Sequence, residues 1–106
     1  MRTSRNQNIS SEVFATPGTT HGQNTISSTA ENVIDVTMDA TTEQVFLQVT
    51  GDQLRVTFDG VTDPTATKGV IYSDGDVALW SKTQAKKAKG IRVTADVVVE
   101  FQELAY

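Results

Sequence analysis

The sequence contains no cysteine, one histidine and one tryptophan among its 106 residues. Without cysteine there is no disulfide framework, no thiolate metal site and no cysteine nucleophile. His21 is the only histidine and lies in a polar stretch, which argues against both a histidine-ligated catalytic zinc site and a Ser-His-Asp triad. No apolar run approaches the roughly 18 residues that a membrane span requires, so we expect neither a span nor a secretory signal. These absences predict a protein that is not an enzyme and carries no cofactor.

The charge balance also excludes one class of partner. The formal net charge is −4, which disfavours nucleic-acid binding through a general basic field. Hydrophobic residues make up 38% of the chain and charged residues 21%, which is typical of one globular domain at this length. What the chain has in quantity is threonine, at 16 residues, and valine, at 13. Such β-branched side chains favour sheet over helix.

The chain divides in composition near residue 30. Residues 1–30 are rich in serine, threonine, asparagine and glutamine, and their few apolar residues follow no period. This segment is predicted to be either a disordered tail or an extended arm that becomes ordered against a neighbouring subunit. In the second case Val13, Phe14 and Ile26 are the expected anchors for a partner. Residues 31–106 form the predicted β-domain.

Alternating apolar residues predict three strands in the first half of that domain. The segments 33–38, 44–50 and 54–58 each place every second apolar side chain on one face. Gly51 and Asp52 separate the second from the third, so we predict a tight hairpin there, with glycine supplying the positive φ of a type II′ turn.

The second half shows shorter segments. A loop is predicted over 59–68, followed by strands at 69–73 and 77–81. The lysine-rich segment 82–89 is predicted to form one helical turn that Gly90 ends.

The C-terminal segment 91–104 allows two interpretations. It forms either one long strand or, as we favour, a hairpin that turns at Ala95 and Asp96. Six to seven short strands then predict a small, jelly-roll-like antiparallel β-sandwich or barrel preceded by an extended N-terminal arm. The predicted core residues are Ile34, Val36, Val45, Leu47, Val49, Leu54, Val56, Phe58, Val70, Tyr72, Leu79, Ile91, Val93, Val97, Val99 and Phe101. So small a core favours oligomerisation, and we expect a homo-oligomer.

Four loop aspartates have two interpretations. Asp59, Asp63, Asp74 and Asp76 supply oxygen ligands at the short spacings that calcium sites use. Aspartate is also a common turn residue, because its carboxylate accepts hydrogen bonds from nearby backbone amides. We favour the structural turns.

Two further features are candidates for binding. Trp80 is predicted to lie in the core or at an interface, with a sugar-stacking platform shared with Tyr72 and Tyr106 as the alternative. The nearby lysines form either a solvated loop or a contact with an acidic protein surface. These lysines are Lys82, Lys86, Lys87 and Lys89. From this region Trp80, Lys86, Lys87 and Lys89 are the possible interface residues.

Part of the sequence resembles a group of small virion proteins of tailed bacteriophages. The shared pattern is a strand that ends in Asp-Gly (55–60, RVTFDG), a proline-threonine-alanine loop leading to glycine (63–70, DPTATKGV), and two late strands (89–94, KGIRVT, and 97–101, VVVEF). The resemblance covers about 44–101. It implies a small β-domain with a structural role as a capsid decoration, head-fibre or head-to-tail component.

Two classes of function remain open at this stage. The first is a capsid decoration, or cement, subunit on the virion surface, made in the bacterial cytoplasm, which binds the major capsid protein or another virion protein through its arm and β-domain. The second is a carbohydrate- or host-surface-binding module of a head fibre or tail. A head–tail adaptor is a third variant that differs in partner and not in chemistry.

Overall fold

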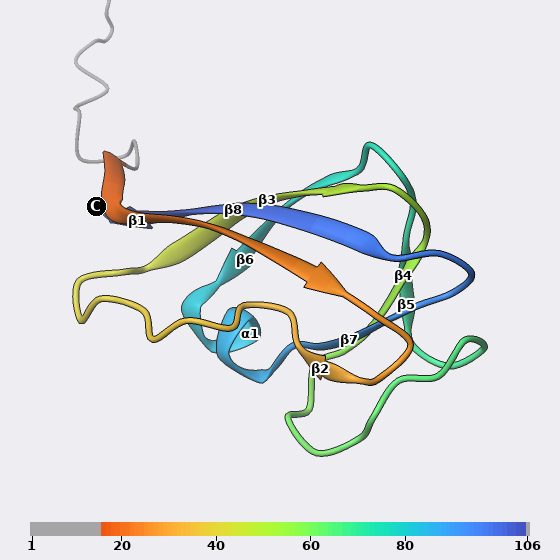
Figure 1. Ribbon diagram of the computed structural model, residues 1–106. Coiled ribbons are helices and arrows are strands. Elements are labelled where there is room, and N and C mark those ends of the chain that lie inside the picture. The colour runs from red at the N-terminus through yellow and green to blue at the C-terminus, as the bar shows by residue number, and fades with distance from the viewer. Residues whose placement is uncertain (1–15, 106) are drawn as a thin grey trace, which may run out of the picture.

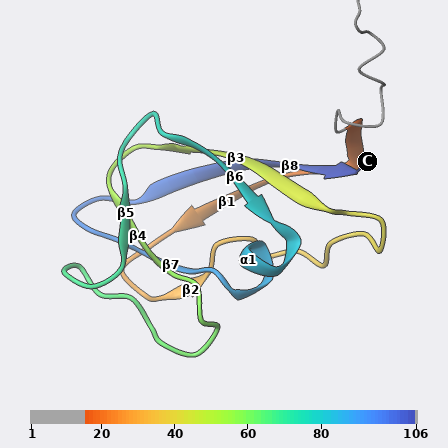
Figure 2. The ribbon, with the colours of Figure 1, turned by 180° about the vertical axis from the view of Figure 1, so that it is seen from behind.

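The computed structural model describes the backbone of residues 16–105 and the side chains from Thr20 onward. Within this range the chain forms eight strands and one short helix. They are β1 (Thr16–Ile26), β2 (Glu31–Asn32), β3 (Gln44–Thr50), β4 (Leu54–Thr57), β5 (Val70–Tyr72), β6 (Val77–Ser81), α1 (Lys82–Lys87), β7 (Lys89–Arg92) and β8 (Val97–Ala105). Figure 1 shows them as two layers, and Figure 2 shows β6 leading directly into α1.

The strands form two four-stranded sheets. Sheet A has the order β1-β8-β3-β6, and sheet B has the order β2-β7-β4-β5. All the neighbouring strands are antiparallel. The pairs β1–β8, β2–β7, β3–β6 and β4–β5 fall alternately in sheet A and sheet B, which is the strand order of a jelly roll. The predicted all-β, jelly-roll-like sandwich is confirmed, with eight strands in place of six to seven.

The predicted hairpin at Gly51 and Asp52 is wrong. β3 lies in sheet A and β4 in sheet B, so residues 51–53 cross between the sheets. Gly51 has the expected positive φ, of 108°, but a Cβ there would also lie 2.8 Å from the carbonyl oxygen of Asp96. A sheet-crossing corner therefore uses the same glycine that a hairpin would.

The favoured C-terminal hairpin is wrong for the same reason. β7 belongs to sheet B and β8 to sheet A, and residues 93–96 cross between them. The two crossings bind each other, because the Asp52 carboxylate accepts hydrogen bonds from the amides of Thr94 (2.8 Å) and Ala95 (2.6 Å). Those amides, with that of Gln53, lower the pKa of Asp52.

The prediction that the arm extends to residue 30 is wrong. Residues 16–26 form β1, which pairs along β8, and Ile26 is fully buried in the core of its own domain. Ile26 is therefore unable to anchor a neighbouring subunit through its side chain. The other two proposed anchors, Val13 and Phe14, lie outside the described residues.

The predicted strand at 33–38 is also wrong, because only Glu31–Asn32 pairs, with β7. Side chains replace the missing ladder: Asn24 donates to the carbonyl oxygens of Asn32 and Val33, both at 3.1 Å. Farther along, the buried Glu103 accepts from the amide of Asp39 at 3.0 Å. The segment 33–43 is thus held as an irregular connection between the sheets.

The core lies between the two sheets and is capped by α1. Most of the predicted inward residues are buried, but Val36, Val70 and Leu79 are exposed. Core residues that the alternation did not predict are Ile26, Val33, Trp80, Ala85 and Ala88. In β6 the large Trp80 side chain points inward, so its neighbour Leu79 must point outward.

The predicted helical turn is confirmed as α1, but its end is not at Gly90. Ser81 caps the start, accepting from the amide of Gln84 while the Gln84 side chain accepts from the amide of Ser81. Ala88 ends the helix, and Gly90 lies in β7. A Cβ on Gly90 would lie 2.7 Å from Val33 Cγ2, so close packing explains this glycine. Among the described residues, no helix has the length and apolar character needed to cross a membrane.

Candidate interaction surface

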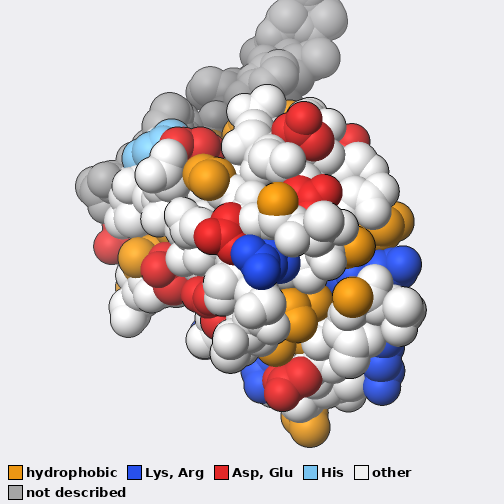
Figure 3. Space-filling model, turned by 45° about the vertical axis from the view of Figure 1, so that its right-hand side comes forward, with side chains coloured by type: hydrophobic (Ala, Val, Ile, Leu, Met, Phe, Trp, Pro, Cys, Tyr) orange, Lys and Arg blue, Asp and Glu red, His pale blue; other side chains and the backbone are white. Residues whose placement is uncertain are grey.

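The described residues expose seven large apolar side chains, and five of them lie on β3 and on β5 and β6, the strands at the open edges of the two sheets. We call the following five residues the apolar flank: Phe46 (46% exposed), Val70 (53%), Ile71 (42%), Val77 (58%) and Leu79 (52%). Of the other described residues only Val36 and Val61 belong to the same class. Figure 3 shows apolar side chains among acidic and basic ones on the side that carries β4 and β5. An exposed apolar surface of this kind marks an interaction site.

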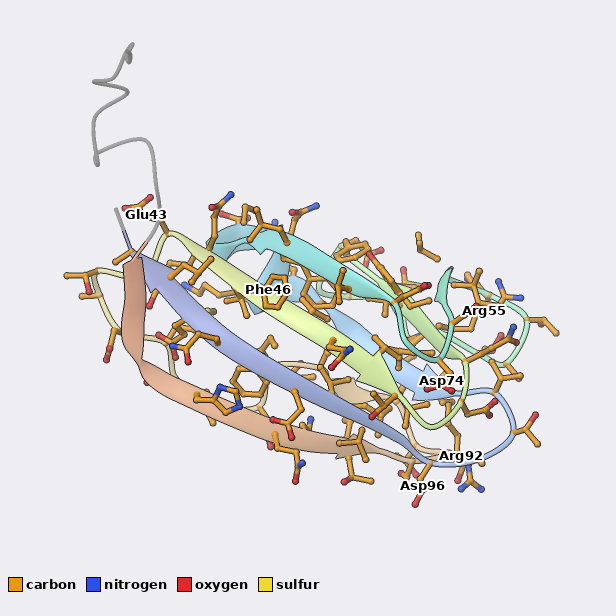
Figure 4. All side chains as sticks on the ribbon, turned by 90° about the horizontal axis from the view of Figure 1, so that it is seen from above. Glu43, Phe46, Arg55, Asp74, Arg92 and Asp96 are labelled. Carbon is orange, nitrogen blue, oxygen red and sulfur yellow. The ribbon has the colours of Figure 1, made fainter. Side chains whose placement is uncertain are left out.

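Strand register sets how the flank is built. Phe46 on β3 lies directly opposite Leu79 on β6, and both point away from the core. In Figure 4, which looks onto the outer face of sheet A, Phe46 stands on β3. On sheet B, Ile71 lies opposite Arg55, and Val70 lies opposite the buried Val56. Because directly paired residues point to the same face, Ile71 shares the outer face of sheet B with Arg55. The flank therefore includes part of the outer face of each sheet, near the two open edges.

An aromatic cluster supports the flank from inside. Trp80 is 2% exposed, with the Phe58 ring at 5.2 Å and the Tyr72 ring at 6.0 Å, both edge to face. Its Nε1 donates to the Tyr72 hydroxyl at 3.2 Å. Trp80 thus joins β6 to β5 across the core. It is neither an interface residue nor part of a sugar-stacking platform, and Tyr106 lies outside the described residues.

The corner that joins β5 to β6 is firmly held. The Asp74 carboxylate accepts from the amide of Gly51 at 2.9 Å, and Asp76 accepts from the amide of Ser73 at 2.8 Å. The amide of Gly75 donates to the carbonyl oxygen of Val49 at 2.7 Å. These bonds order the edge strands without any partner, so the flank is preformed.

The loop aspartates act as turn residues. Asp59 accepts from the amides of Val61 (2.9 Å) and Thr62 (2.7 Å) and from the Thr62 hydroxyl (2.6 Å). These bonds, led by the hydroxyl, lower the pKa of Asp59 to about 2. Asp63 pairs with Lys89 at 3.1 Å. Nowhere in the described residues do three or more histidine, aspartate or glutamate side chains gather in a way that could hold a metal ion.

The lysines do not form one patch. Lys82 donates to the carbonyl oxygens of Asp39 (3.0 Å) and Ala40 (3.4 Å). Lys82 and Lys86 border a hollow of about 290 Å³ between α1 and the segment 32–38. The stem of Lys87 lies over Gly60, and Lys89 pairs with Asp63. Of the proposed interface residues, Lys87 and Lys89 therefore contact the same loop, at Gly60 and Asp63, whereas Lys86 faces the hollow beside Lys82.

A polar network occupies the other side of the outer face of sheet A. His21 Nε2 lies 2.9 Å from Glu100 Oε2, and Nδ1 lies 3.2 Å from Gln102 Oε1. The hydrogen bond to Glu100 is the main cause that raises the pKa of His21, and the same bond lowers the pKa of Glu100. The network links the edge strand β1 to β8 and faces a hollow of about 280 Å³ that Phe46 also lines.

Comparison with known proteins finds no counterpart: no protein-family model, curated protein or solved structure gives a significant match. The surface must therefore be interpreted from its own chemistry.

Sequence reasoning missed the flank because it assigned Val70 and Leu79 to the core. The usable signal was the segment 77–81, VALWS, in which both alternate faces are apolar. A strand with two apolar faces either is buried on both sides or contacts a partner.

Proposed function

We propose that this chain is a non-enzymatic structural protein that assembles through its apolar flank, and that its place of action is the virion of a tailed bacteriophage. Within that setting the proposed role is a capsid decoration subunit on the outer surface. The observation that carries the proposal is the flank itself, with four exposed apolar side chains on the two edge strands β5 and β6 and a fifth, Phe46, on the neighbouring β3.

Three features support a structural role. The jelly-roll strand order recurs in viral capsid proteins, although it also occurs in lectins. The loop aspartates are bonded to the backbone or to Lys89, and Trp80 lies in the core, so the second proposed class, a carbohydrate-binding module, loses the residues that suggested it. The virion setting comes from the phage-like pattern within residues 44–101.

The proposed partner of the apolar flank is the major capsid protein. A lattice of major capsid subunits offers one surface in many copies, so a flank of modest area gains occupancy when several copies bind together. The N-terminal segment with Val13 and Phe14 remains a proposed second attachment. A deletion that tests it must stop before Thr16, because removing residues 1–28 would also remove β1 and the buried Ile26.

The test uses charge placed on and off the flank. Ile71→Lys and Val36→Lys change residues of nearly equal exposure, 42% and 39%, but only Ile71 belongs to the flank. Purified particles that lack the chain are mixed with each variant, and bound chain is measured after sedimentation. We expect Ile71→Lys to lose binding at least tenfold and Val36→Lys to bind like the native chain. Equal binding of all three forms, or absence of the native chain from purified particles, would overturn the proposal.

A further inference from the structure

We propose that β6 pairs edge to edge with β6 of a second copy, about a two-fold axis at Leu79, so that the two A sheets join into one eight-stranded sheet. The inference rests on the proposed assembly through the apolar flank and specifies which part of the flank binds another copy of this chain. It follows from the backbone direction of β6, its register and its lack of edge protection.

The backbone groups of β6 that face outward can be assigned. The amide of Val49 donates to the carbonyl oxygen of Asp76 (2.8 Å), and the amide of Lys82 donates to that of Glu43 (3.0 Å). These bonds direct the even-numbered residues of this segment toward β3. Because direction alternates along an antiparallel strand, the backbone groups of Val77, Leu79 and Ser81 point away from the sheet. In agreement, the Ser81 amide donates to the Gln84 side chain at 2.9 Å and not to β3.

A two-fold axis at Leu79 makes this edge complementary to itself. Leu79 then lies opposite Leu79 of the second copy, and each exchanges its amide and carbonyl with the other. Val77 lies opposite Ser81, at the end of the paired segment. One residue farther out, the backbone of Asp76 lies opposite that of Lys82, so residues of opposite charge end the paired strands. The Lys82 ammonium donates to the carbonyl oxygens of Asp39 and Ala40, and the Asp76 carboxylate accepts from the Ser73 amide.

The pairing would also bring the exposed apolar side chains of the two copies into one continuous row. Phe46 stands opposite Leu79 on the outer face of sheet A. In the joined sheet the order across the axis becomes Phe46, Leu79, then Leu79 and Phe46 of the second copy. Directly opposed apolar side chains of this kind stabilise the pairing of two antiparallel strands.

The other edges of the two sheets are protected by proline, irregular register or short length over part or all of their length, whereas β6 has none of these features. β1 contains Pro17 and a register shift between Pro17 and His21, and β2 and β5 have two and three residues. β6 has five residues, VALWS, with no charge, no proline and no register shift against β3. Proteins protect edge strands with such features because an unprotected edge pairs with another chain. In Figure 2, β6 lies along the outside of sheet A.

The test uses single cysteines, because the native chain has none. Leu79→Cys and Val70→Cys change residues of matched exposure, 52% and 53%, on the two edges of the flank. A hydrogen-bonded antiparallel pair separates opposite Cα atoms by about 5.5 Å, which suits a disulfide. Under mild oxidation we expect Leu79→Cys to give a covalent dimer at least ten times faster than Val70→Cys. Equal rates, or faster linking at Val70, would overturn the pairing.

Charge exchange provides an independent readout. Leu79→Lys and Leu79→Glu each set like charges together at the axis, so each variant alone is expected to sediment as a monomer, and an equimolar mixture as a dimer. A mixture that stays monomeric while the native chain forms dimers would overturn this register. Flank-dependent particle binding in the Ile71→Lys experiment would still support the proposed function in that case, so the two failures are distinguishable.

Discussion

Replacing Gly22 with alanine tests whether β1 belongs to the domain. Gly22 lies opposite Phe101 on β8, and a Cβ at position 22 would lie 2.3 Å from Phe101 Cζ and 2.6 Å from Cε1. Carbon atoms in contact normally lie about 3.5–4.0 Å apart, so the ring must move by more than ~1 Å. Phe101 is 1% exposed, and the surrounding core leaves little room for that movement.

The expected magnitude follows from this clash. Overpacking in a filled core costs about 1–3 kcal/mol, which lowers the melting temperature of a domain of this size by roughly 4–20 °C. If residues 16–26 were instead a free arm, glycine to alanine would leave the free energy of unfolding unchanged, because residue 22 would be equally free in the folded and unfolded chains. The two interpretations therefore predict a clear loss of stability in one case and no change in the other.

The assay is denaturant unfolding followed by Trp80 fluorescence. Phe101→Leu removes the clashing atoms, so the double variant Gly22→Ala, Phe101→Leu should lose less than the sum of the single changes, by at least ~0.5 kcal/mol. Thr25→Ala, on the exposed face of the same strand, serves as a control and should change stability by less than about 0.5 kcal/mol. A Gly22→Ala protein as stable as the native one would refute the packing of β1 against β8.

Three further predictions concern the polar contacts. His21→Gln should lower the melting temperature most between pH 4.5 and 6.5, where His21 is protonated and Glu100 is ionised. The raised pKa of His21 gives stability that is lost as the pH rises through the pKa of His21 in the folded protein. The lowered pKa of Glu100 gives stability that is lost as the pH falls through the pKa of Glu100 in the folded protein. A difference that does not vary with pH contradicts this. Asp59 should titrate near pH 2 by NMR, and Asp59→Ala should speed amide exchange in its turn; a pKa near 4 would show that the turn is open. Tyr72→Phe removes the acceptor for Trp80 Nε1 and should cost about 1 kcal/mol in denaturant unfolding, whereas no loss would mean that water replaces the hydroxyl.

The fold class was predictable because it rests on local periodicity. The segments 44–50 and 54–58 show apolar alternation in the sequence, and they contain the strands β3 and β4 in the structure. Their connections were not predictable. A tight hairpin and a corner between sheets both use glycine at positive φ followed by a polar residue, as at Gly51 and Asp52. β8 is the strand that pairs with β3 and decides between them, about half the chain away.

The interaction surface was harder to predict for a related reason. Alternation in β6 assigns Val77 and Leu79 to one face and Ala78 and Trp80 to the other, but it does not say which face is inward. The Tyr72 hydroxyl and the Phe58 ring fix Trp80 inside, and they come from the end of β5 and from the residue that follows β4. The same limit applies to Ile26, whose burial depends on the pairing of β1 with β8.

Hydrogen–deuterium exchange on the chain, free as a dilute monomer and bound to its particle, tests the central claim of assembly through the apolar flank most directly. Amides that point outward from an edge strand exchange quickly until a partner covers them. We predict that binding protects residues 70–81, most strongly at Val77 and Leu79, and leaves the outer face of β1 unchanged. Protection confined to residues 20–26, with Val77 and Leu79 exchanging as in the free chain, would contradict the account.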